Sequence, residues 1–179
     1  MWIYIFIVLF LLIIGSIFNK LVRIKNYVEE AEADIKVQLK RRFDLIPNLI
    51  ETVKGYMSHE KEVLEKITEL RSKALSTSDF NESDKINKEI SKNISNILVS
   101  FENYPDLKSN QNFLALQTEL SDTENKIQAS RRFYNNVVKD YNILIESIPT
   151  NIFAKIFNHK RKALLDISEE ESKNISVKF

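Results

Sequence analysis

The chain has 179 residues, a formal net charge of +1 and no cysteine. This near balance of charge offers no overall electrostatic basis for binding nucleic acid. The lack of cysteine excludes disulfides, thiolate metal sites and cysteine-linked lipids. Glycine occurs 2 times and proline 3 times. Because all-β folds need turn residues about every 8–12 positions, the composition predicts an all-α chain with a few long helices.

Residues 1–19 contain no charged side chain and form an almost wholly apolar run. About 17–18 such residues reach roughly 26 Å as a helix, close to the thickness of the hydrocarbon core of a bilayer. The alternative is a cleaved secretory signal, but the run lacks a basic start and offers a poor cleavage site at Gly15-Ser16-Ile17. We therefore predict a retained, single-pass transmembrane anchor in the cell (inner) membrane.

Lys20, Arg23 and Lys25 follow the apolar run directly. Basic residues beside a membrane segment tend to remain in the cytoplasm, so the domain that follows is predicted to be cytoplasmic.

The next residues carry one apolar helical face, at Ile24, Val28, Ala31, Ile35 and Leu39. We expect this first helix to continue directly from the anchor and to end at a corner formed by residues 41–44. Asp44 would then cap a second helix with Pro47 in its first turn, ending near Ser76.

Asp79 and Glu82 have the spacing of a capping box and predict the start of a third helix, which ends at Tyr104-Pro105-Asp106. A fourth helix follows over 113–148, with a spacing close to 3.5 residues that predicts coiled-coil-like packing, and Pro149 stops it. Residues 151–157 form a short amphipathic piece. The prediction is an antiparallel up-and-down four-helix bundle over 20–158, after the anchor at 1–19 and before a polar, flexible tail at 159–179.

The search for chemistry finds few candidates. Di-iron bundles use Glu-x-x-His pairs, but Tyr56 and Ile156 stand three residues before His59 and His159, the two histidines. No G-x-S-x-G elbow and no glycine-rich phosphate loop occur. We therefore expect no catalytic residues, no metal and no cofactor, and predict that the protein is not an enzyme.

Two sets of polar residues remain as candidate sites. The first lies at the expected corner and along the fourth helix: Arg41, Arg42, Asp44, Asn48, Glu124, Asn125, Arg131, Arg132 and Asn135. These side chains either form ion pairs that fix the helix register or bind a partner or an anion. The second set is basic and is a candidate for contact with anionic lipid: Lys20, Arg23, Lys25, Lys160, Arg161 and Lys162. Its alternative is a solvated charged surface.

Several stretches resemble the LemA family. The longest is Gln38 to Tyr56, which reads QLKRRFDLIPNLIETVKGY. The others are Tyr104 to Lys108 with Asn112-Phe113, Glu119 to Ile127, Arg131 to Asn135, and Pro149-Thr150-Asn151. Order and spacing agree from the anchor to about Phe157. The chain departs from the family at 159–165, which is basic and lacks the usual Pro- and aromatic-containing segment. Its ending, Val177-Lys178-Phe179, again resembles the family.

The resemblance implies a bacterial single-pass membrane protein with a helical-bundle domain and no established enzymatic activity. The long helical bundle, the retained anchor and the lack of a catalytic constellation lead us to expect a scaffold or protein-interaction module at the cell membrane, with an unidentified protein partner and membrane lipid around the anchor. The balanced charge leads us to expect no nucleic acid. The alternative is a lipid-binding, membrane-organising or stress-related module. The sequence leaves homo-oligomerisation open.

Overall fold

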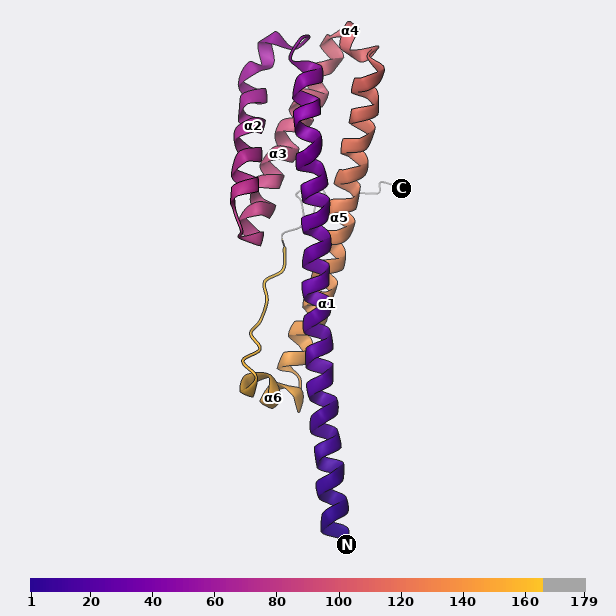
Figure 1. Cartoon of the computed structure of the whole chain (residues 1–179), viewed down its shortest axis with the longest axis vertical. Helices are drawn as coiled ribbons and strands as arrows, with labels where there is room; N and C mark the ends of the chain where they lie inside the picture. Colours follow the sequence, from indigo (N-terminus) through magenta and orange to yellow (C-terminus); the bar gives the residue numbers. More distant parts are fainter. Residues whose placement is uncertain (166–179) are drawn as a thin grey trace, which may run out of the picture. The chain divides into compact units, whose positions relative to one another are not determined.

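The computed structural model describes residues 1–165, and every regular element among them is helical. The expectations for the tail beyond residue 165 lie outside the described residues. The long helices are α1 (Trp2–Val53), α2 (Lys61–Ser76), α3 (Phe80–Ser100) and α5 (Gln111–Glu146). The short elements are η1 (Ser58–Glu60), η2 (Phe101–Asn103), α4 (Pro105–Lys108) and α6 (Thr150–Ile156). Figure 1 traces this order along the chain. The all-α prediction is confirmed.

The chain divides into two compact units. Unit 1 contains Met1–Glu32 together with the chain from Arg131 onward, and unit 2 contains Ala33–Ser130. Because α1 and α5 each contribute residues to both units, the polypeptide passes between the units within helices.

Unit 2 is built from α2, α3, the C-terminal part of α1 and the N-terminal part of α5. Each of these segments buries residues at the three- and four-residue spacing of one helical face. The buried apolar residues include Ile35, Leu39, Phe43, Ile46, Leu49, Val53, Leu64, Ile67, Leu70, Ile86, Ile90, Ile94, Ile97, Phe113, Leu120 and Ile127. Asp79 caps α3 by accepting a hydrogen bond from the backbone N–H of Glu82 at 2.8 Å, as the sequence predicts.

The predicted corner at residues 41–44 is wrong. Helix α1 continues through this segment and through Pro47 to Val53, so Asp44 lies inside a helix and caps nothing. The physical reason is the apolar spacing: Leu39, Phe43, Ile46, Leu49 and Val53 are all buried and continue a single face. The break falls later, at residues 54–57, and interrupts the helix expected to run on to Ser76.

Unit 1 contains the apolar start of α1, the C-terminal part of α5, α6 and a segment over 159–165 without regular secondary structure. Leu21, Val28, Tyr134, Val138 and Ile145 are buried in this unit, whereas the apolar side chains of residues 1–13 are largely exposed. The described residues include one helix, α1, that is long and apolar enough to cross a membrane. Pro149 follows α5 closely, as predicted, and α6 (Thr150–Ile156) begins and ends one residue earlier than the amphipathic piece predicted over 151–157.

Candidate functional site

Arg42 lies at the centre of a polar cluster inside unit 2. Its guanidinium, on α1, forms an ion pair with the Glu124 carboxylate on α5 and donates to Ser91 Oγ on α3 at 2.7 Å. Arg42 Nη1 also lies 3.5 Å from Asn87 Oδ1, and Ser91 Oγ lies 3.1 Å from Glu124 Oε2. The contacts thus link three helices through charged and hydroxyl groups.

The cluster is shielded from water at its basic end. The Arg42 side chain is 3% exposed, while that of Glu124 is 26% exposed. A buried guanidinium is costly unless it is paired and hydrogen-bonded, and Glu124, Ser91 and Asn87 supply those partners. The chemistry available is therefore that of a fixed charge pair that holds α1, α3 and α5 in register.

Arg41, the neighbour of Arg42, lies on the outside of unit 2. Its guanidinium donates to Glu119 Oε2 at 2.7 Å and lies 3.8 Å from Asp122 Oδ2. The pKa of Asp122 is lowered, first by its hydrogen bond with Lys126 and further by the positive charges of Lys126 and Arg41. This network joins α1 to α5 at the surface, where such pairs contribute little to stability.

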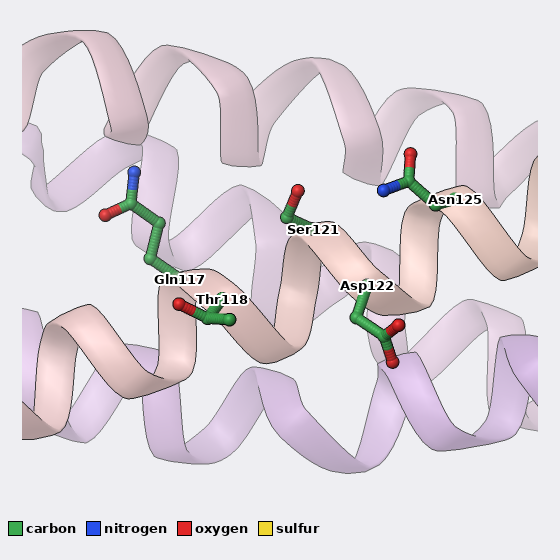
Figure 2. A pocket seen from close by; sticks show the side chains of 5 residues that line it. All are labelled: Gln117, Thr118, Ser121, Asp122 and Asn125. Carbon is green, nitrogen blue, oxygen red and sulfur yellow. The ribbon is translucent and has the colours of Figure 1, made fainter.

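An open hollow of about 420 Å³ lies beside this network, along α5. It is lined by polar side chains only: Gln117, Thr118, Ser121, Asp122 and Asn125. Figure 2 shows the Gln117 and Asn125 amides and the Ser121 hydroxyl on one side of α5, with the Asp122 carboxylate directed the opposite way. Amides, hydroxyls and a carboxylate suit hydrogen bonding to a polar partner.

The remaining residues of the first predicted set are dispersed. Asp44 pairs with Lys40 at 2.9 Å on the surface of α1, and the Asn48 carbonyl accepts from the Thr52 hydroxyl at 2.7 Å. Arg131, Arg132 and Asn135 belong to unit 1, where Arg131 is buried and Arg132 exposed. Of the nine residues, Arg42 and Glu124 are in direct contact; Asn125 lines the hollow.

Asn135 has a different role, shared with a residue that the sequence does not single out. Asn135 exchanges two hydrogen bonds with the backbone of Leu165, at 2.8 and 2.9 Å, and Asn142 does the same with Lys162, at 3.0 and 2.9 Å. Seven residues of helix span about 10.5 Å. Three extended residues span about 10 Å, so both pairs fit one straight segment. The seven-residue repeat of asparagine is the signal that could have revealed the pair.

The contacts between α5 and the segment that follows α6 also include residues 159 and 160. The Tyr141 hydroxyl donates to the Lys160 carbonyl at 3.1 Å and lies 3.2 Å from His159 Nδ1. Burial lowers the pKa of His159, and the positive charge of Lys25 lowers it further. Burial also raises the pKa of Tyr141. Residues 159–165 therefore lie against α5 as a segment, here called the strap.

The basic residues of the second predicted set all belong to unit 1. Lys20, Arg23 and Lys25 are exposed on α1, with Lys25 3.6 Å from Glu29. Lys160 and Arg161 are exposed in the strap, and Arg161 pairs with Glu146 at 2.7 Å. Lys162 is half-buried and has its backbone held by Asn142. Among the residues described, no group of three or more His, Cys, Asp or Glu could hold a metal ion.

Comparison with known proteins gives a family. Residues 31–179 match the LemA family. Protein LemA of Metamycoplasma hominis is 32% identical over 183 aligned positions, which cover 96% of this chain and 82% of that protein. The match takes in both units, including the Arg42–Glu124 pair and the asparagines that hold the strap. The chain therefore belongs to the LemA family.

Proposed function

We propose that the protein is a single-pass, membrane-anchored interaction module, in which residues 1–19 cross the bilayer and unit 2 binds a protein partner. The observation that carries the proposal is the continuity of α1. One helix runs from Trp2 to Val53 and supplies both the exposed apolar segment and part of the unit 2 core. The membrane segment and unit 2 are therefore joined by helical chain and not by a glycine-rich linker.

The partner surface that we propose is the polar hollow on α5. It lies in unit 2, with the Arg41–Glu119 pair on the same unit. An open hollow lined by amide, hydroxyl and carboxylate groups favours a polar protein segment over an apolar small molecule. We propose that unit 2 faces the cytoplasm, because Lys20, Arg23 and Lys25 follow the apolar run.

Topology is the first test. A reporter active only inside the cell and a reporter active only outside are each fused after residue 179. Activity of the inside reporter alone supports a cytoplasmic unit 2. Activity of the outside reporter alone would overturn the orientation, and release of the fusion into the medium would overturn the anchor.

The interaction itself is tested by photo-crosslinking in cells. A photoreactive phenylalanine analogue replaces Ser121 or Asn125 in the hollow, or Glu65 on the exposed face of α2 as the matched control. We expect one reproducible adduct from both hollow positions and none of the same mass from the control. Identical adducts at all three positions would show non-specific contact and contradict the proposal.

A further inference from the structure

The short helix α6 has its apolar side chains on the outside. Thr150 and Ala154 are buried, whereas Ile152 and Ile156 are 57% and 68% exposed. Positions four apart share a helical face, so the two isoleucines form one outward face and the two small residues the inward one. Ile148, in the turn before α6, is 85% exposed. Ile148, Ile152 and Ile156 together therefore form an exposed apolar surface.

This surface lies at the end of the apolar run of α1. The Phe157 ring, directly after α6, meets the Phe18 ring edge-on, with ring centroids 5.1 Å apart. Phe18 is the penultimate residue of the charge-free run, and Lys20 follows it closely. In Figure 1, α6 lies beside α1, and the N-terminal part of α1 extends beyond it as a single helix. Both segments belong to unit 1, so their proximity is a property of one unit.

The two chain segments beside this surface are basic. Residues 1–28 and 147–165 contain no aspartate and no glutamate. The same two ranges contain Lys20, Arg23, Lys25, Lys155 and the basic run 160–162. Glu146, at the end of α5, reaches into the region and pairs with Arg161. Exposed apolar side chains in basic chain segments are typical of a segment that lies in the interface of an anionic bilayer.

We propose that Ile148, Ile152 and Ile156 form an interfacial foot, which inserts into the headgroup and acyl-chain boundary beside the anchor. Lys155 and Lys160 lie close enough in the chain to meet lipid phosphates. The inference rests on the proposed membrane anchoring of residues 1–19. It adds a second point of contact, so that α1 leaves the bilayer in a fixed orientation instead of pivoting at Lys20.

Because the chain has no cysteine, a single introduced cysteine can be labelled at one defined position. Full-length variants Ile152→Cys, Phe10→Cys and Asn136→Cys carry an environment-sensitive fluorophore and are reconstituted in phosphatidylcholine–phosphatidylglycerol vesicles. Asn136 is the matched control, exposed on α5 in the same unit. Quenchers attached at two depths along the lipid chain report the depth of each probe.

We expect strong quenching at position 10 by the deep quencher, quenching at position 152 by the shallow quencher, and none at position 136. Adding Ile148→Ser and Ile156→Ser to the Ile152→Cys variant should weaken quenching at 152 and leave position 10 unchanged. All of these positions are exposed, so the substitutions leave the core intact.

The two proposals fail in different ways. Quenching at position 10 with none at 152 would overturn the foot and leave the anchor standing. No quenching at either position would overturn both. A probe at 152 that is shielded from aqueous iodide but not quenched from lipid would show that protein covers α6, and this too would overturn the foot.

Discussion

The Arg71 side chain donates its Nε–H to the backbone carbonyl of Phe43, at 2.7 Å. Pro47 lies four residues after Phe43 inside α1 and has no N–H to offer that carbonyl. A guanidinium from α2 therefore takes the place of the missing helix donor. Tertiary structure in this way compensates for a proline that, by local rules, belongs in a first turn.

This relationship predicts coupling between Arg71 and Pro47. Removing a hydrogen bond from a charged donor costs about 1.5–3 kcal/mol, so Arg71→Leu should lower the free energy of unfolding by that order. In a Pro47→Ala background the helix supplies its own N–H, and the cost of Arg71→Leu should fall by about 1 kcal/mol or more. Urea denaturation of the four proteins, followed by circular dichroism, gives the coupling. Additive effects would show that Arg71 acts elsewhere.

The buried pair in unit 2 predicts a strong asymmetry between neighbouring arginines. Arg42→Met removes the ion-pair partner of Glu124 and should lower the free energy of unfolding by about 3 kcal/mol, the lower end expected for a broken buried pair, because Glu124 keeps some access to water. Arg41→Met removes an exposed ion pair and should lower the free energy of unfolding by no more than about 1 kcal/mol. Urea denaturation compares the two.

A double replacement separates pairing from packing. Arg42→Met combined with Glu124→Met removes both charges, and the double variant should be more stable than Arg42→Met alone. A double variant less stable than the single one would show that each residue acts independently, for example through Ser91 and Asn87.

The asparagine contacts predict that the strap detaches when one of them is removed. Asn142→Ala deletes both hydrogen bonds to Lys162, at about 1 kcal/mol each, so the Lys162 amide should exchange with deuterium about 10- to 100-fold faster. Exchange measured by NMR or mass spectrometry reports this directly. Asn136→Ala, on the exposed side of the same helix, is the control and should leave exchange unchanged. Equal effects from both variants would assign the loss to α5 rather than to the strap.

The lowered pKa of His159 predicts that the folded protein loses stability as the pH falls. Because burial and the nearby Lys25 lower its pKa below 6.5 in the folded protein, the folded state binds a proton less readily than the unfolded chain. The stability linked to His159 is therefore complete above pH 6.5 and is lost as the pH falls through the lowered pKa. An NMR titration of the His159 ring in the full-length protein should give a midpoint below 6.5.

Lys25→Gln is the companion variant for this titration. It removes the smaller of the two causes, so the midpoint should rise part of the way toward 6.5, while burial keeps it below that value. A wild-type midpoint at or above 6.5 would contradict the half-buried placement of the ring against Tyr141.

The sequence alone determined the helical class, the apolar run, the cap at Asp79, the C-terminal end of α5 near Pro149 and the family. These features depend on local chemistry: residues one turn apart share a face, Asp79 caps its own helix, and proline cannot continue one. The same local rules placed a corner at residues 41–44, because Pro47 reads as a first-turn residue. The predicted four-helix arrangement and the cytoplasmic orientation stay predictions.

Only the tertiary structure decided where distant residues meet. The donor that serves Phe43 comes from Arg71, 28 positions later, and the acid that pairs with Arg42 comes from Glu124, 82 positions later. The strap is held by Asn135 and Asn142 across 30 and 20 positions. In an isolated helix each of these side chains is one polar group among many. Its partner is fixed only when apolar faces pack and bring other helices within hydrogen-bonding distance.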